Sequence, residues 1–189
     1  MSRAALLLAA LAAAALPAPA LAQKPRLSVE QRLQRLEDES AIRNIFIAYA
    51  AALDQRNPDA YVALFAKEGQ WINGSIVRKG PEEIRVLVAG MFRNTPPGFV
   101  NAESFELTFH PDIKVEGDHA TARSEHVLFR RHADGSGMPQ AVLFGRYEDA
   151  FIREDGAWKI LKRIDYPTMR SRWNSGCSGW RTRRPSARS

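Results

Sequence analysis

The stretch YAAALDQRNPDAYVALFAKEGQWING, Tyr49–Gly74, carries the pattern from which the fold is predicted. It begins as a helix with a regular apolar stripe and is interrupted at Asn57-Pro58. Proline suits the first turn of a helix and asparagine suits its cap, so a second, short helix is expected to follow. Gly69 is expected to end that helix, and QWING then reads as an aromatic strand that turns at Gly74. The predicted order is therefore helix, helix, strand.

The residues before this stretch extend the first helix. SVEQ, Ser28–Gln31, has a hydroxyl at its first position and an amide three residues later, which is the pattern of a capping box. Apolar side chains then recur at intervals of three and four residues, at Leu33, Leu36, Ile42, Ile45, Phe46, Tyr49 and Leu53. This spacing predicts one long amphipathic helix. A third helix, EEIRVLVAGMF, is expected to open at Gly80-Pro81.

The character of the chain changes after residue 100. Four alternating or apolar segments follow, separated by turn sequences: ESFELTFHPDIKV, HATARSEHVLFRRH, QAVLFGRYEDAFIR and WKILKRIDY. Helices first and meandering strands afterwards predict an α+β domain, with the helices gathered on one face of an antiparallel sheet.

The first 22 residues read as a secretory signal peptide. Arg3 precedes an apolar run from Ala4 to Leu16, and Ala20-Leu21-Ala22 provides a small-residue cleavage site. A membrane anchor is the alternative, but this run is too short to span about 30 Å of hydrocarbon. We therefore expect cleavage after Ala22 and a periplasmic or secreted protein.

The net charge of +6 arises at the ends of the chain. Once Arg3 and six arginines from Arg170 to Arg188 are set aside, 20 Lys and Arg stand against 21 Asp and Glu. This balance argues against a nucleic-acid partner for the domain. Residues 168–189 are expected to form a basic, disordered tail, and membrane contact is considered only for that tail. Cys177 is the single cysteine, so no intrachain disulfide is possible.

The chain resembles the SnoaL-like domains of the nuclear-transport-factor-2-like superfamily. Three segments carry the resemblance, which covers roughly residues 36–167: AIRNIFIAYAAALDQRNPDAYVALFAKEGQW, HPDIKVEGDHATARS and FGRYEDAFIREDGAWKILKR. It implies a cone of three helices over a strongly curved sheet with a pocket inside. It also implies a homodimer formed through the outer face of the sheet. Residues 23–35 would be a helical extension before this domain.

Two enzyme groups of the superfamily suggest site residues. In an ungapped match to ketosteroid isomerases, Tyr49 falls at the position of the tyrosine that donates to the oxyanion. Asn73 falls where those enzymes keep an aspartate base, and an amide cannot take a proton. In a similar comparison with scytalone dehydratases, Asp54 matches a pocket aspartate and His126 lies near a pocket histidine. Their other pocket histidine falls near Glu106.

The residue pattern itself supports some of these positions. Asp54 lies in the last helical turn, where the helix dipole disfavours a carboxylate, so either a pocket role or a capping and solvent-facing role must explain it. Tyr49 continues the apolar stripe and reads equally as a core tyrosine or as a hydrogen-bond donor in the pocket. Trp71 is expected to form a wall of the pocket.

Strand alternation separates the histidines. His126 shares a face with Ala122 and Ser124, and these small neighbours leave room for a ligand, although a satisfied core histidine is the alternative. On the preceding strand the apolar residues alternate so that Glu106 and His110 should point outward. Pro111 could mark a bulge that resets this order, and His110 is therefore kept as a candidate pocket residue.

These observations predict Asp54 and His126 as a catalytic acid–base pair, with Tyr49, Trp71, Asn73 and His110 contacting substrate. No dinucleotide fingerprint, P-loop, zinc-protease or nucleophile-elbow motif is present, so neither cofactor nor metal is expected. The first hypothesis is cofactor-free dehydration, isomerisation or cyclisation of a small hydrophobic carbonyl compound. A binding module without catalysis and an assembly subunit are the alternatives.

Overall fold

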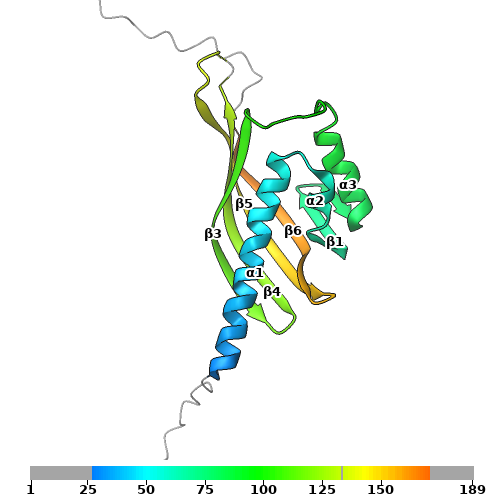
Figure 1. The fold of residues 1–189 in the computed structure, drawn as a ribbon, viewed down its shortest axis with the longest axis vertical. Helices are drawn as coiled ribbons and strands as arrows, with labels where there is room; N and C mark the ends of the chain where they lie inside the picture. The colour runs from blue at the N-terminus through cyan, green and yellow to red at the C-terminus, as the bar shows by residue number, and fades with distance from the viewer. Residues whose placement is uncertain (1–26, 133, 171–189) are drawn as a thin grey trace, which may run out of the picture.

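The computed structural model describes residues 27–132 and 134–170. Three helices and six strands make up this part of the chain (Figure 1). In chain order they are α1 (Val29–Asp54), α2 (Pro58–Val62), β1 (Phe65–Asn73), β2 (Ile76–Lys79), α3 (Gly80–Met91), β3 (Ser104–Glu116), β4 (His119–Arg131), β5 (Pro139–Glu154) and β6 (Ala157–Arg170). The predicted signal peptide and residues 171–189 of the tail lie outside the described residues.

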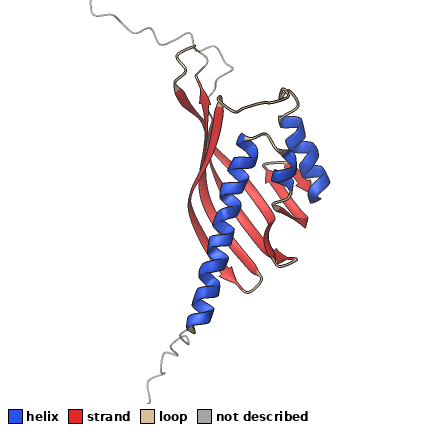
Figure 2. Ribbon diagram, viewed as in Figure 1, coloured by secondary structure: helices blue, strands red, loops and turns tan. Residues whose placement is uncertain are grey.

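The strands form one curved sheet in the order β2-β1-β6-β5-β4-β3. All neighbours are antiparallel except β1 and β6, which run parallel. The three helices lie on one side of the sheet, with α1 crossing it and α2 and α3 near the β1 end (Figure 2). The α+β architecture predicted from the order of elements is confirmed.

The helix signals in the sequence act as expected at the start of each helix. Ser28 and Gln31 form both hydrogen bonds of a capping box at the beginning of α1. The Asn57 side chain accepts from the backbone N–H of Ala60 and caps α2, with Pro58 in its first turn. These caps mark where α1 and α2 begin.

Two predicted boundaries differ from the structure. Helix α2 ends at Val62, not at Gly69, which lies inside β1. A side chain at Gly69 would come within 2.8 Å of the Ala66 carbonyl oxygen, so this glycine serves a bulge in the β1–β6 pairing. Strand β6 continues to Arg170, so residues 168–170, which were expected to belong to the disordered tail, are part of the sheet.

The core lies between α1 and the inner face of the sheet. Apolar and aromatic side chains fill it, among them Ile42, Phe46, Ile84, Phe151 and Ile160, each at most 4% exposed. Two groups of polar side chains are buried in or beside this core: Asp38 of α1 with Arg153 and Trp158, and a larger cluster towards the end of the sheet where α1 terminates. No helix in residues 27–132 and 134–170 has the length and apolar character needed to span a bilayer.

Candidate active site

The structure has a cavity of about 470 Å³ between the end of α1, β1 and the inner face of β3–β6. We call it the inner cavity. Aromatic and aliphatic side chains supply much of its wall, and polar groups converge on one part of it. Its lining consists of Tyr49, Leu53, Asp54, Arg56, Tyr61, Trp71, Met91, Phe92, Ser104, Glu106, His126, Leu128, Arg130, Leu143, Tyr147 and Asp165. Its volume lies in the range usual for small-molecule sites.

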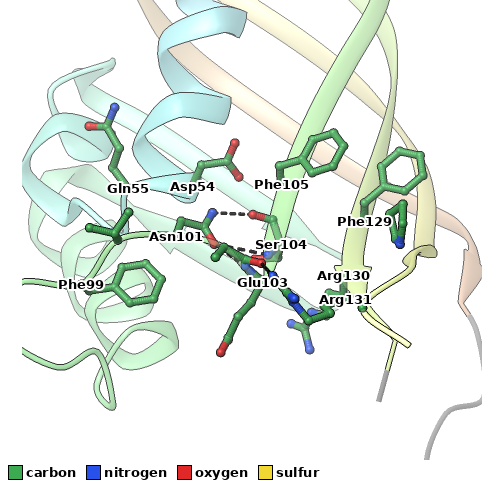
Figure 3. Close-up of a pocket in the computed structure, with 14 residues that line it drawn as sticks. Asp54, Gln55, Phe99, Asn101, Glu103, Ser104, Phe105, Phe129, Arg130 and Arg131 are labelled. Atoms are coloured by element: carbon green, nitrogen blue, oxygen red, sulfur yellow. Dashed lines mark hydrogen bonds between the residues drawn. The ribbon is translucent and has the colours of Figure 1, made fainter. Parts of the chain in front are cut away.

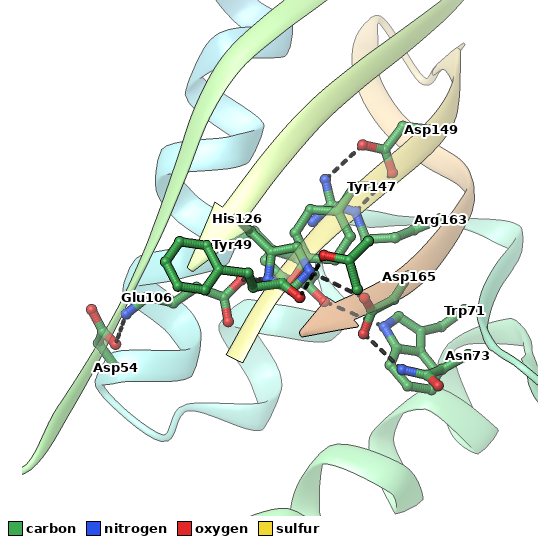
Figure 4. Close-up of polar contacts among 12 residues, drawn as sticks. Tyr49, Asp54, Trp71, Asn73, Glu106, His126, Tyr147, Asp149, Arg163 and Asp165 are labelled. Carbon is green, nitrogen blue, oxygen red and sulfur yellow. Dashed lines mark hydrogen bonds and ion pairs between the residues drawn. The ribbon is translucent and has the colours of Figure 1, made fainter. Parts of the chain in front are cut away.

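His126 is the centre of the polar part (Figure 4). It projects from β4 to the inner face, as strand alternation predicted, and is 1% exposed. Its Nε2 lies 3.1 Å from Oδ1 of Asp165. The ring stacks on Tyr147 with the centroids 4.0 Å apart and the planes 7° apart. On the next strand Gly145 stands opposite His126 and leaves the space that the imidazole occupies.

Glu106 lies on the other side of the imidazole. Its Oε1 is 3.9 Å from Nδ1 of His126 and accepts a 2.6 Å hydrogen bond from the Tyr147 hydroxyl. Burial raises the pKa of Glu106, although the Tyr147 hydrogen bond and the nearby histidine oppose this effect. The imidazole therefore stands between two carboxyl groups in a largely dehydrated place, and one of the two has a raised affinity for protons.

Asn73 is connected to the same cluster through Asp165. The two residues are cross-strand neighbours on β1 and β6. The Asn73 side-chain amide donates a 2.8 Å hydrogen bond to Oδ2 of Asp165, while Oδ1 faces His126. The amide that cannot itself take a proton therefore orients a carboxylate on the adjacent strand.

Tyr49, Tyr61 and Trp71 form a hydrogen-bonded group on the opposite wall. The Trp71 indole N–H donates to the Tyr49 hydroxyl at 3.3 Å, and the two tyrosine oxygens are 2.6 Å apart. Two hydroxyl protons are available and the short contact uses one of them. The second can point to a ligand oxygen. Burial raises the pKa of both tyrosines, so both remain protonated donors.

A buried ion pair lies beneath this group. Arg163 is fully buried and binds both oxygens of Asp149, at 2.7 and 2.9 Å. Its guanidinium lies 4.0 Å from the ring centroid of Tyr49 and 4.3 Å from that of Tyr147. The pair fixes both aromatic rings from below, and its charges balance, so it adds little net charge to the cavity.

Asp54 lies nearer the opening of the cavity. Its Oδ1 accepts a 3.0 Å hydrogen bond from the backbone N–H of Glu106, and partial burial raises the pKa of its carboxyl group. It also lines a second hollow of about 590 Å³, the mouth groove, together with Gln55, the segment 99–105 and the upper end of β4 (Figure 3). Asp54, Ser104 and Arg130 line both hollows.

Tyr49, Trp71 and His126 line the inner cavity, whereas Asn73 joins the cluster through Asp165 without lining the cavity, and two other expectations change. Asp54 does not pair with His126. Figure 4 shows it at the Glu106 backbone, and the carboxyl groups beside the imidazole are those of Glu106 and Asp165. The expected bulge occurs at His110, with a φ of 52°, yet it turns the ring outward, where 82% of the side chain is exposed. His110 does not line the cavity.

Sequence reasoning missed Asp165, Tyr147 and the inward orientation of Glu106. Phe105 and Leu107 dominate the apolar alternation of β3, but they are 43% and 47% exposed on the outer face, so Glu106 points inward. Gly145 was the available signal for a buried side chain on an adjacent strand, because a glycine inside a strand often accommodates a close approach. Among residues 27–132 and 134–170, no three His, Cys, Asp or Glu side chains are arranged to hold a metal ion.

Helices on the concave face of a curved six-stranded sheet, with a polar cluster inside the cone, define the class of fold. A sequence profile of the SnoaL-like domain matches residues 34–164. The chain therefore belongs to the SnoaL-like family. An uncharacterized protein of Mycobacterium tuberculosis is 26% identical over 156 residues, which cover 77% of this chain and 93% of that protein.

Solved structures support the same fold. A protein of unknown function from Mycobacterium tuberculosis aligns with a TM-score of 0.63 at 21% identity, covering 72% of this chain and 75% of its own. A nuclear-transport-factor-2-like protein from Novosphingobium aromaticivorans has a TM-score of 0.61 at 24% identity, covering 72% and 86%. The hexachlorocyclohexane dehydrochlorinase LinA type 2 has a TM-score of 0.57 at 18% identity, covering 73% and 90%.

Proposed function

We propose that the inner cavity catalyses cofactor-free proton transfer on a small hydrophobic carbonyl compound, in a dehydratase, isomerase or cyclase type of reaction. One observation carries the proposal: a buried imidazole, His126, lies between the carboxyl groups of Asp165 and Glu106 on the wall of a cavity rich in aromatic side chains. Paired acid and base groups of this kind support general acid–base catalysis without a cofactor.

The two carboxyl groups take different roles in this proposal. The Asp165–His126 pair, oriented by Asn73, accepts the proton from the carbon next to the substrate carbonyl. Glu106, whose pKa is raised by burial, holds its proton more firmly than an ordinary glutamate and serves as the acid. Two titratable groups in environments that separate their proton affinities are the usual basis for assigning an acid and a base.

The tyrosine pair supplies the third function. When the α-proton leaves, the electron pair moves onto the carbonyl oxygen, and the free hydroxyl proton of the Tyr49–Tyr61 pair stabilises that oxygen. In an isomerisation the acid returns a proton at another carbon. In a dehydration the carbon–oxygen bond at the β-carbon breaks, and the leaving hydroxide takes the Glu106 proton and departs as water. LinA, which has this fold, is named for dehydrochlorination, also an elimination.

The test is exchange of α-protons with solvent deuterium, followed by NMR. The mature chain would be incubated in D₂O with hydrophobic ketones such as 2-tetralone, cyclohexenones and medium-chain methyl ketones. We expect exchange above the buffer rate for at least one compound, and a loss of about 10²–10⁴-fold in that excess on His126→Ala or Asp165→Asn.

His119→Gln provides the matched control, because His119 lies on the same strand as His126 but is exposed. It should exchange like the wild type. The catalytic proposal would be contradicted if ketones bind in the cavity but their α-protons exchange no faster than in buffer, with the wild type as with the variants. That result would identify a binding module.

A further inference from the structure

Arg130 is a cation without a partner at the junction of the inner cavity and the mouth groove. It lies on β4 in the same inward row as His126 and Leu128, and it lines both hollows. Figure 3 shows it at the mouth groove. Its cross-strand neighbour is Ser104, the first residue of β3. Within residues 27–132 and 134–170 the Arg130 side chain forms neither a hydrogen bond nor an ion pair, and only its backbone is paired, in the sheet.

The other two arginines at this opening are already engaged. Arg56 pairs with Glu103 at 3.7 Å and stacks on the Phe99 ring at 3.8 Å. Arg131 donates to the Ala102 carbonyl oxygen at 2.7 Å and so ties β4 to the segment before β3. Arg130 is thus the cation at the opening that is free to bind a ligand group.

The charges inside the cavity set the direction in which an anionic ligand could bind. Its inner end holds the carboxyl groups of Glu106 and Asp165, and the positive charge of Arg163 beneath them is balanced by Asp149. A ligand carboxylate placed at that end would have to give up its water beside the carboxyl groups of Glu106 and Asp165, with no unbalanced positive charge to offset the cost. At the outer end, Arg130 would attract it.

Two carboxylates could compete for Arg130, and both have other contacts. Glu103 pairs with Arg56. Asp54 accepts a hydrogen bond from the Glu106 backbone N–H, which holds its carboxyl group at the end of α1. A ligand carboxylate therefore has an advantage over both as a partner for the Arg130 guanidinium.

Resting on the proposed function of the inner cavity, we propose that its substrates are elongated apolar carbonyl compounds with a carboxylate at the far end, which Arg130 binds. His126 and Arg130 are four residues apart on one strand, so about 13 Å separates their Cα atoms. The carbonyl end lies beside His126 and the tyrosine pair, the apolar middle lies along Leu128, and the carboxylate meets the guanidinium at the mouth.

The experiment compares two probes that differ only in charge. 9-Oxodecanoic acid has a ketone near one end and a carboxylate at the other, and its methyl ester has the same chain without the charge. Their dissociation constants would be measured by titration calorimetry on the full chain and on Arg130→Met, which keeps an unbranched side chain and removes the guanidinium charge. Arg123→Met on the outer face of the same strand is the control.

The wild type and Arg123→Met should bind the acid at least about ten-fold more tightly than the ester. This ratio corresponds to the lower end of the range of stabilisation expected for one hydrogen bond between charged groups. Arg130→Met should bind both probes equally, at the affinity that the wild type has for the ester, and Arg130→Lys should keep part of the preference. 4-Oxopentanoic acid, too short to reach both ends, should bind more weakly than the longer acid.

Equal wild-type affinity for acid and ester, no measurable binding of the acid, or an unchanged preference in Arg130→Met would each overturn the proposal. The outcome is separable from that of the catalytic proposal. A preference for the acid that depends on Arg130, without any deuterium exchange, would retain the ligand class and remove the chemistry. Deuterium exchange by the wild type without a preference for the acid would retain the proposed chemistry and remove the proposed ligand class.

Discussion

Gly145→Ala tests whether the His126 ring is held in the place that the structure gives it. A Cβ atom at residue 145 would lie 2.8 Å from Cε1 and 2.9 Å from Cδ2 of the imidazole, and closer still to Nε2. The ring cannot retreat freely, because Tyr147 stacks on it at 4.0 Å. The added methyl group must therefore displace the ring from Asp165 or push the two strands apart.

The expected cost follows from two effects. Overpacking of a close-packed interior costs about 1–3 kcal/mol, and a weakened hydrogen bond to a charged group costs about 1.5–3 kcal/mol. Since a ring that moves to relieve the overpacking weakens the hydrogen bond, the two costs do not add in full, and we expect a loss of about 3 kcal/mol. For a domain of this size that loss lowers the melting temperature by roughly 10 °C. Proton-transfer activity should fall with it.

Gly90→Ala is the matched control. Gly90 lies in α3 with no atom within 4 Å of the added Cβ, so the same substitution should be neutral or stabilising by up to about 1 kcal/mol. Thermal unfolding would be combined with NMR of the His126 imidazole. If Gly145→Ala matches Gly90→Ala in stability and leaves the imidazole resonances unchanged, the described packing around His126 is wrong.

Three further predictions concern pH, assembly and export. Because burial raises the pKa of Glu106, its protonated form contributes stability that is complete below its ordinary value of 4.5 and is lost as the pH rises through the folded value. The unfolding free energy of Glu106→Gln should therefore increase relative to that of the wild type as the pH rises above 4.5. Urea titrations would measure both free energies, and a difference between them that does not change with pH would contradict this prediction. One cross-strand row of apolar side chains on the outer face consists of Leu107, Val127, Phe144 and Met169. If the proposed homodimer forms through this row, Leu107→Lys should convert it to a monomer, as measured by light scattering. A wild-type protein that is already monomeric would refute the dimer. Intact mass of protein from the periplasm or medium of its own host should show a chain that begins at Gln23, and a chain that still carries Met1 would contradict export.

The fold was accessible from sequence because its signals are local. Capping residues mark the starts of α1 and α2, and strand alternation placed His126 on the inner face, where the structure has it. Gly69 was misread because a glycine that ends a helix and a glycine at a bulge look the same in a sequence. Only the approach of the Ala66 carbonyl oxygen distinguishes them.

The candidate site was less accessible because its contacts are long-range. Asp165 meets His126 across 39 residues of sequence, and no local pattern distinguishes it from other acidic residues near the end of a strand. Glu106 was assigned to the wrong face because the exposed Phe105 and Leu107 imitate a buried row. Apolar side chains that face outward make alternation misleading, so parity alone could not decide which face of β3 lines the cavity.

The central claim is that Asp165 and His126 act as one proton-accepting unit in the inner cavity. A double-mutant cycle on solvent deuterium exchange tests it most directly, with Asp165→Asn, His126→Ala and the combined variant compared on a ketone that the wild type exchanges. Residues that act as a unit are not additive, so the combined variant should exchange no more slowly than the slower single variant. If the losses of the two single variants instead multiply in the combined variant, the two residues act independently and the proposed pair is contradicted.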